Sequence, residues 1–136
     1  ANKGMLVMQN KMFDHDALMQ KLGGVLVATE KGTATAELII REDHLQGHGT
    51  CNGAVIFALA DAVFAVACNG GEYPAVGQHC NISYLKPAKL GDTLTAHAAL
   101  RAEAGRTEIY DVSIQNQQQQ LVAEFRGISR ILVPRG

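Results

Sequence analysis

The sequence predicts an α+β fold in which a curled antiparallel sheet wraps around one long helix. The helix is predicted from an apolar run between Gly53 and Asn69, in which only Asp61 is charged. A helix that is apolar around its whole circumference belongs inside a protein. The sheet is predicted from segments in which apolar and polar residues alternate. A sheet that curls around the helix and buries it on all sides accounts for both patterns.

The segments before the apolar run predict a helix and a hairpin. Residues 5–22 carry apolar side chains at helical spacing among polar ones, and the glycine pair 23–24 ends this helix. Residues 25–28 and 33–40 predict two strands, joined by a turn at 30–32. The second strand alternates polar and apolar residues, so one of its faces is expected to be buried.

The segments after the hairpin are expected to complete the sheet. A polar, glycine-containing loop at 41–52 leads into the apolar helix, which the glycines at 70–71 stop. Four further strands are predicted at 75–85, 93–100, 107–115 and 121–132, with turns at 90–92 and 103–105.

Length, charge and cysteine content narrow the class of protein. The 136 residues are enough for a core that needs neither disulfides nor metals. The net charge of -1, with no block of Lys and Arg, gives no reason to expect nucleic acid or a membrane surface as partner. Three cysteines without a secretory signal pattern favour a reduced, cytoplasmic protein. The apolar run is interrupted by Asp61 and is a poor membrane span.

We expect one domain over residues 1–131. The tail 132–136 reads Leu-Val-Pro-Arg-Gly, which matches a thrombin-cleavage sequence and is interpreted as a remnant outside the fold. Neither an internal repeat nor a linker divides the chain.

Asp61 is the first candidate for catalysis. An ionised carboxylate inside an apolar helix costs several kcal/mol unless another group pairs with it or a site requires it. The alternative is a buried structural carboxylate that accepts hydrogen bonds from strand or loop N–H groups.

Gly53 is the second candidate, because it opens the predicted helix directly after Asn52, a favoured N-cap residue. The free N–H groups and the dipole of a helix start suit a developing negative charge, such as a thioester oxyanion. The alternative is that the glycine only relieves crowding. Gly53 and Asp61 are eight residues apart, which is about 12 Å along a helix axis. Since reacting groups must come within about 3–3.5 Å, the two would act together only from different subunits across a two-fold axis.

Other polar residues give weaker signals. Gln46, in the loop before Gly53, could position a water or a substrate carbonyl, or could simply be solvated. The histidines and cysteines at 44, 48, 51, 79 and 80 have no closed four-ligand zinc spacing, which disfavours a metal site. A Cys–His nucleophilic pair is possible, although a small buried thiol is the commoner role of cysteine.

A few cationic and hydroxyl side chains near predicted strand ends could contact the phosphates of a nucleotide-bearing substrate. Each alone is expected to be a solvated surface group. These residues are Lys86, Arg106, Thr107 and Arg130.

The loop and helix at 45–61 resemble the signature of hotdog-fold acyl-CoA thioesterases, with the phenylacetate-degradation subgroup as the nearest pattern. That pattern runs roughly N-G-H-x-x-x-H-G-G-x-x-F-x-L-A-D, and the resemblance continues through 81–88, 90–92, 110–112 and 125–127. It implies a curled sheet around one helix, and subunits that pair into homodimers and often homotetramers. It also implies Gly53 as the oxyanion N–H and Asp61 of the partner subunit as general base or nucleophile. No metal or cofactor is expected, since coenzyme A is part of the substrate.

This chain departs from the pattern at three positions. Asn52 stands in place of the histidine of H-G-G, and Ala54 in place of its second glycine. Asn52 can cap the helix and donate a hydrogen bond, but it cannot titrate near neutral pH. Gln46 replaces an asparagine and is similar to the residue of 4-hydroxybenzoyl-CoA thioesterases. The same resemblance places Lys86, Arg106, Thr107 and Arg130 where relatives contact coenzyme A.

The resemblance implies an acyl-CoA thioesterase that favours aryl-acetyl-CoA or aryl-CoA. Two alternatives stay open from the residues. One is a hotdog dehydratase or hydratase, for which the usual histidine is missing. The other is a non-catalytic acyl-CoA-binding protein, in which the replacement of the family histidine by Asn52 indicates that catalytic activity has been lost.

Overall fold

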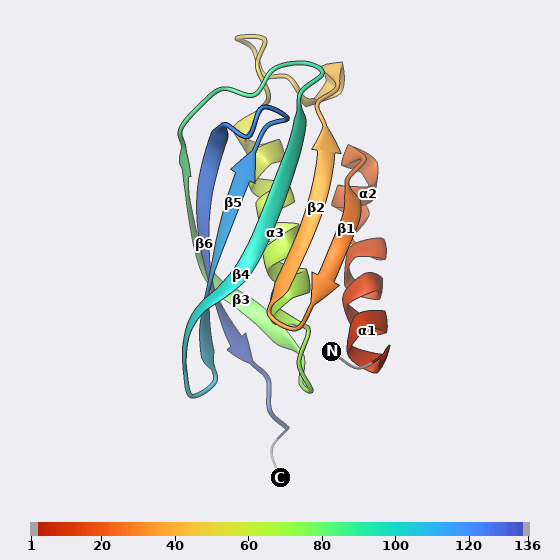
Figure 1. Cartoon of the computed structure of the whole chain (residues 1–136), viewed down its shortest axis with the longest axis vertical. Coiled ribbons are helices and arrows are strands. Elements are labelled where there is room, and N and C mark those ends of the chain that lie inside the picture. Colours follow the sequence, from red (N-terminus) through yellow and green to blue (C-terminus); the bar gives the residue numbers. More distant parts are fainter. Residues whose placement is uncertain (1–2, 135–136) are drawn as a thin grey trace.

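A six-stranded antiparallel sheet curls around a central helix in the computed structural model, which describes residues 3–134 (Figure 1). The central helix α3 spans Gly53–Cys68, and the strand order is β1-β2-β4-β5-β6-β3. The strands are β1 (Val25–Glu30), β2 (Thr33–Ile39), β3 (Ala75–Tyr84), β4 (Thr93–Ala104), β5 (Thr107–Gln115) and β6 (Leu121–Ile131). Helices α1 (Lys3–Asp14) and α2 (Ala17–Leu22) lie beside β1 and α3, and a short 3-10 turn, η1, spans Glu42–His44. This arrangement confirms the predicted α+β fold.

The N-terminal segment forms two helices where the sequence predicted one. Asp16 has an extended backbone and caps α2, with its carboxylate accepting from the Met19 N–H at 2.9 Å. This capping bond starts a new helix, because a side chain that satisfies a first-turn N–H competes with continuation of the preceding helix. The predicted end is confirmed, since Gly23 has a φ of 89° and takes the left-handed C-cap conformation.

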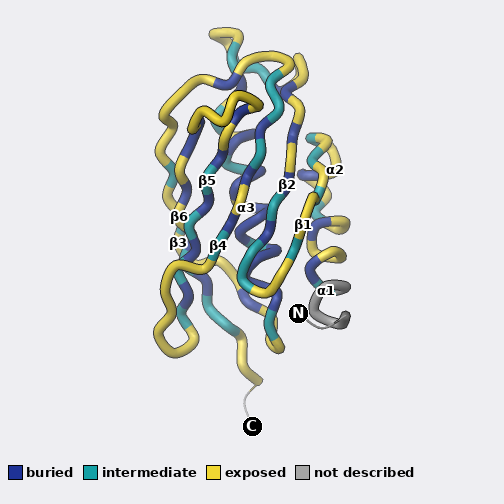
Figure 2. Tube along the Cα trace, in the orientation of Figure 1, coloured by how far each residue is buried: buried dark blue, intermediate teal, exposed yellow. Residues whose placement is uncertain are grey.

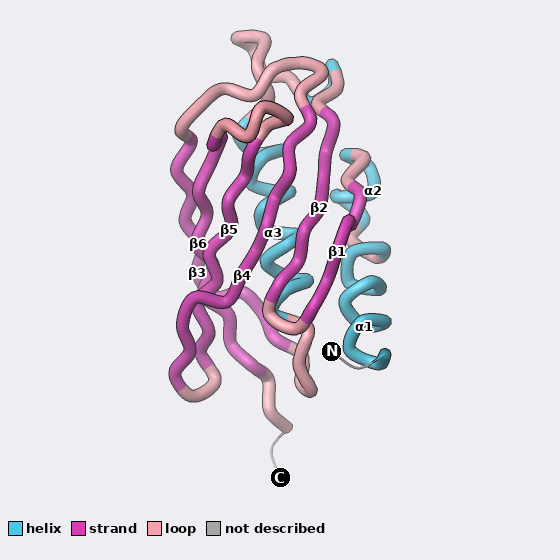
Figure 3. Tube along the Cα trace, in the orientation of Figure 1, coloured by secondary structure: helices cyan, strands magenta, loops and turns pink. Residues whose placement is uncertain are grey.

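The sheet has the predicted strands, with β1 two residues longer than predicted and a larger difference at the end of β4. The hairpin continues four residues beyond the predicted end at Leu100, and Ala104 pairs with Thr107. The prediction of a turn at 103–105 was therefore too early. The turn falls on Gly105 and Arg106, because Gly105 is the residue that adopts the left-handed backbone, with a φ of 61°. Figure 3 shows the resulting long hairpin projecting beyond the rest of the sheet.

The core lies between α3 and the inner face of the sheet (Figure 2). Phe64 is at its centre, with its ring 5.8 Å from the rings of both Tyr110 and Phe125. Alternate residues of β2, β4 and β5 are buried and contact this helix, which is the alternation that the sequence predicts.

One stripe of α3 is not covered by this chain. Ala54 and Asp61 are exposed, and Phe57, Ala58 and Ala65 between and beyond them are only partly buried. The prediction that the sheet buries the helix on all sides is therefore wrong. The reason is geometric: β3 is the last strand of the sheet and pairs only with β6, so its outer edge leaves this face of α3 open.

None of the helices within residues 3–134 has the length and apolar character needed to cross a membrane.

Candidate active site

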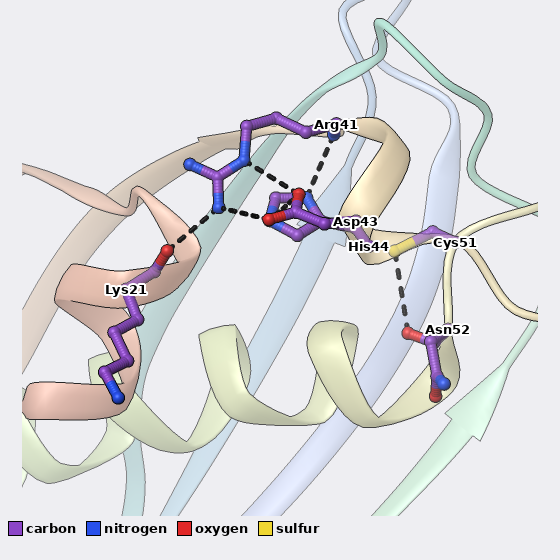
Figure 4. A network of polar contacts seen from close by, with 6 residues as sticks. All are labelled: Lys21, Arg41, Asp43, His44, Cys51 and Asn52. Atoms are coloured by element: carbon purple, nitrogen blue, oxygen red, sulfur yellow. Dashed lines mark hydrogen bonds and ion pairs between the residues drawn. The ribbon is translucent and has the colours of Figure 1, made fainter.

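The loop that leads into α3 is tied to α2 by Arg41 (Figure 4). The guanidinium donates to the main-chain carbonyl of Lys21 at 2.9 Å and to the Asp43 carboxylate at 3.0 Å. The Arg41 N–H donates to Nδ1 of His44, a buried side chain. The His44 carbonyl then accepts from the N–H of Asn52 at 2.8 Å. These bonds fix the position at which α3 begins.

Asn52 caps α3 and leaves the Gly53 N–H available. Its Oδ1 accepts from the Ala54 N–H at 2.9 Å. Its main-chain carbonyl accepts from the N–H groups of Val55 and Ile56 at 3.0 and 3.4 Å. Among the described residues, no acceptor contacts the Gly53 N–H. With the positive end of the helix dipole behind it, this N–H can bind a negatively charged oxygen.

Tyr84, at the end of β3, packs directly on Gly53. Its hydroxyl donates to the Gly53 carbonyl at 2.8 Å. A Cβ added to Gly53 would stand 3.1 Å from both Cζ and Oη of Tyr84. A side chain at this position would therefore press on the ring, which would have to shift by a few tenths of an ångström. Sequence reasoning did not assign Tyr84 a role, because its contact with Gly53 joins residues 31 positions apart.

Gln46 is bonded within the loop itself. Its Nε2 donates to Oγ1 of Thr50 at 2.7 Å, and its Oε1 accepts from the N–H of His48. The main-chain N–H of Gln46 also donates to the Thr50 carbonyl at 2.9 Å. The amide therefore shapes the loop that precedes Asn52.

Asp61 lies midway along α3, on the uncovered stripe. It borders a cavity of about 470 Å³ between α3 and β3, together with Met12, Phe64, His79 and Cys80. Although Asp61 is exposed to solvent in this chain, its neighbours partly remove water from around the carboxylate, which raises its pKa, and the negative charge of Asp16 raises it further. No hydrogen bond or ion pair joins Asp61 to another described residue. The alternative hypothesis, a structural carboxylate that accepts hydrogen bonds from N–H groups, is therefore not supported among the described residues.

Gly53 and Asp61 lie on the same continuous helix, as the sequence predicted. Eight residues of α-helix separate them by about 12 Å along the axis. A single chain therefore cannot bring the Gly53 N–H and the Asp61 carboxylate to the same carbonyl group.

The histidines and cysteines of the weaker hypotheses are divided between two places. His44 and Cys51 belong to the loop before α3, whereas His79 and Cys80 lie in β3. Within residues 3–134, no three His, Cys, Asp or Glu side chains gather closely enough to hold a metal ion. Burial raises the pKa of Cys51 to about 11 and also raises that of Cys80. Raised pKa values keep both thiols protonated, which argues against a cysteine nucleophile.

The cationic candidates fall at two ends of the molecule. Thr107 pairs with Arg130, and the Arg106 carbonyl accepts from the Ile131 N–H at 2.8 Å, so these residues share one end of β5 and β6. Lys86 lies at the other end, where its N–H donates to the Val122 carbonyl at 3.2 Å. Eight residues of β6 separate Val122 from Arg130, or about 26 Å. One chain therefore does not gather all four residues around one phosphate group.

Comparison with known proteins identifies relatives of similar length and fold. The model of the Thioesterase superfamily matches residues 48–123. The acyl-coenzyme A thioesterase PaaI of Escherichia coli is 42% identical over 118 residues, which cover 87% of this chain and 84% of that protein.

Solved structures agree with this match. The Escherichia coli PaaI structure superposes with a TM-score of 0.90 at 38% identity, covering 95% of this chain and 94% of that one. A Streptococcus mutans protein solved with bound acetyl-CoA has a TM-score of 0.78 at 28% identity, covering 84% of this chain and 92% of its own.

Proposed function

Since the chain belongs to the Thioesterase superfamily, has its hotdog fold and is an acyl-CoA thioesterase, we propose that it hydrolyses aryl-acetyl-CoA and aryl-CoA thioesters to the free acid and coenzyme A. The cavity beside Asp61 supports an apolar acyl group, because Met12, Phe64, Ala65 and Val76 line it. The Escherichia coli relative is a protein from the phenylacetic acid degradation operon, which supports an aromatic acyl group.

The proposed site forms between two subunits. Two copies of α3 would pack antiparallel along their uncovered stripes, where Ala54, Ala58 and Ala65 allow close approach. The open edges of two β3 strands would then continue one sheet across the dimer. This pairing brings the start of one helix toward the middle of the other. A homodimer is the minimum assembly, and a second pairing would give a homotetramer.

The observation that carries this proposal is the free Gly53 N–H at a capped helix start, together with an unpaired carboxylate on the open stripe of the same helix. The N–H would bind the carbonyl oxygen of the thioester as it becomes negative. Asp61 of the partner would either take a proton from water or attack the carbonyl carbon itself. A raised pKa makes Asp61 a stronger base than an ordinary aspartate.

The remaining residues would support this reaction without a metal or cofactor. Gln46 holds the loop before the helix and would orient the reactants, while Asn52 fixes the helix start. In an assembly, Lys86 of one subunit and Arg106, Thr107 and Arg130 of another would contact the phosphates of coenzyme A. A reducing compartment such as the cytoplasm suits the free thiols of Cys51, Cys68 and Cys80.

The test is release of free thiol from phenylacetyl-CoA, 4-hydroxybenzoyl-CoA and a medium-chain acyl-CoA. We expect the aromatic esters to be the better substrates, and Asp61→Ala to lower kcat by at least about a hundredfold. Light scattering establishes that the variant keeps the wild-type assembly. A faster rate with the medium-chain ester would contradict the aromatic preference, and an active Asp61→Ala protein would contradict the site.

A second function, binding of acyl-CoA without turnover, is favoured by Asn52, whose amide cannot titrate near neutral pH. Titration calorimetry with a non-hydrolysable thioether analogue separates the two. Binding of the analogue with no thiol release from any of the three esters would identify a binding protein.

A further inference from the structure

Tyr84 and Asn52 hold opposite ends of one peptide unit at the start of α3. The unit joins Gly53 to Ala54. Its carbonyl accepts from the Tyr84 hydroxyl at 2.8 Å, and its N–H donates to Oδ1 of Asn52 at 2.9 Å. Hydrogen bonds arranged in such a chain polarise and strengthen one another. The peptide unit adjacent to the free Gly53 N–H is therefore fixed from two sides.

Gly53 needs this support because it has no side chain. A glycine reaches a wider range of backbone angles than any other residue, and the first residue of a helix has few intrahelical bonds to restrain it. The Tyr84 ring occupies the space of a Gly53 side chain, with Cζ and Oη 3.1 Å from where Cβ would stand. The ring thus limits the movement of the Gly53 Cα, and the hydroxyl limits rotation of the carbonyl.

The bond is not required to satisfy a buried group. A carbonyl in the first helical turn already has a donor four residues further on. Tyr84 is 51% exposed in this chain, so its hydroxyl could form a hydrogen bond with water instead. Burial of the ring against the helix raises the pKa of Tyr84, which keeps the hydroxyl protonated as a donor.

We propose that Tyr84 is a positioning residue that holds Gly53 so that its N–H points at the thioester oxyanion. This inference rests on the proposed function and adds a residue from the edge strand to the site. A glycine at the helix start also lets the ring pack closely on this backbone, since an added Cβ would stand 3.1 Å from it.

The test compares Tyr84→Phe with Tyr73→Phe. Both changes remove one hydroxyl from a partly exposed tyrosine, and Tyr73 lies in the loop after α3, beyond the end of the helix opposite to Gly53. We expect Tyr84→Phe to lower kcat about five- to tenfold with KM within twofold of wild type, because an interaction that acts in the transition state changes kcat rather than binding. Tyr73→Phe should leave both constants unchanged.

A second measurement reports the geometry without turnover. The amide nitrogen of Ala54 responds to hydrogen bonding at the Gly53 carbonyl, and exchange of the Gly53 amide reports its freedom to move. In ¹⁵N-labelled protein, Tyr84→Phe should shift the Ala54 nitrogen resonance and speed exchange of the Gly53 amide, and Tyr73→Phe should do neither.

Equal kcat values for the two variants would overturn the inference, and so would a kcat that falls only in proportion to lost folded protein. If the wild type releases no thiol from any ester, the proposed function fails. The amide measurements then decide the remaining claim: unchanged Gly53 and Ala54 signals in Tyr84→Phe overturn it, and the expected changes support the restraint on Gly53.

Discussion

The ring of Phe64 lies against the backbone of Gly127 so closely that three ring atoms would stand 2.7–2.8 Å from a Cβ at that glycine. A Cβ added to Gly77 of β3 would stand 2.9 Å from the same ring. Phe64 therefore fits between β6 and β3 because both strands carry glycine there. Since Phe64 also borders the cavity beside Asp61, these glycines help to place one wall of the proposed acyl site.

Gly127→Ala should destabilise the protein. Real Cβ contacts are longer than 2.7 Å, so the buried ring or β6 must move, and overpacking of this kind costs about 1–3 kcal/mol. Urea unfolding measures the loss. Gly71→Ala is the matched control, because no described atom lies within 4 Å of its added Cβ. Equal midpoints for the two variants would show that the core absorbs the extra methyl group.

Gly53→Pro should remove catalysis while keeping α3 intact. Proline is tolerated at the first helical position, and it lacks the N–H that the proposed mechanism uses. Gly53→Ala adds a Cβ against Tyr84 but retains the N–H. We expect kcat of the proline variant to lie about 10²–10³-fold below that of the alanine variant, the usual cost of losing one oxyanion donor. Similar kcat values in the two proteins would rule out the Gly53 N–H as that donor.

Mixed oligomers should regain activity if each site uses two subunits. A 1:1 mixture of Asp61→Ala and Gly53→Pro chains, unfolded and refolded together, forms half of its dimers from unlike subunits. One of the two sites in each such dimer is intact, so thiol release should reach about a quarter of the wild-type rate. Refolding each variant alone is the control. A mixture as inactive as its parts would place both groups in the same subunit.

The pH dependence of stability should identify Asp61. Its pKa is raised in the folded protein, so the native state binds the proton more tightly than the unfolded chain does. Wild-type stability relative to Asp61→Asn should therefore fall as the pH rises from the ordinary carboxyl range through the raised pKa. Thermal midpoints of both proteins between about pH 3 and pH 8 measure this difference.

Asp111 provides a control of opposite sign for that measurement. Hydrogen bonding from Arg126, at 2.7 and 2.9 Å, lowers the pKa of Asp111. Its contribution is present above the ordinary carboxyl pKa and is lost as the pH falls through the lowered one. If the Asp61→Asn difference had the same sign as that of Asp111→Asn, the assignment of Asp61 would be wrong.

Asp16→Asn should shift the acid limb of the pH–rate profile to lower pH. The negative charge of Asp16 contributes to the raised pKa of Asp61, and asparagine can still cap α2. The profile of kcat/KM reports the pKa of the free enzyme's base. Asp14→Asn, two residues earlier at the end of α1, is the control. A shift of equal size in both variants would mean that net charge, rather than Asp16, is responsible.

Local sequence signals predicted the elements whose residues decide their own structure. The start of α3 follows from Asn52 and Gly53, and the β1–β2 hairpin follows from alternation and the turn between its strands. The break before α2 was missed, because Asp16 can either continue a helix or cap a new one and only the Met19 contact decides between them. The role of Tyr84 was also missed, because it depends on a contact with Gly53, a residue 31 positions away in the sequence.

The uncovered stripe of α3 could not be read from the helix alone. Alanine and phenylalanine occur both in protein cores and at contacts between subunits. The residue types of Phe57, Ala58 and Ala65 therefore do not distinguish them from the buried side chains around them. The arrangement of the strands, with β3 last in the sheet, determines which of these residues the chain covers.

The open edge of β3 borders the same cavity as Asp61. The surface through which two subunits would associate is therefore also the surface that carries the proposed active site. In the proposed dimer, dissociation would then separate each Gly53 from the Asp61 it works with. Specific activity would fall on dilution, with half of it lost near the dissociation constant of the dimer. The protein concentration would therefore determine what fraction of the subunits belongs to a complete active site.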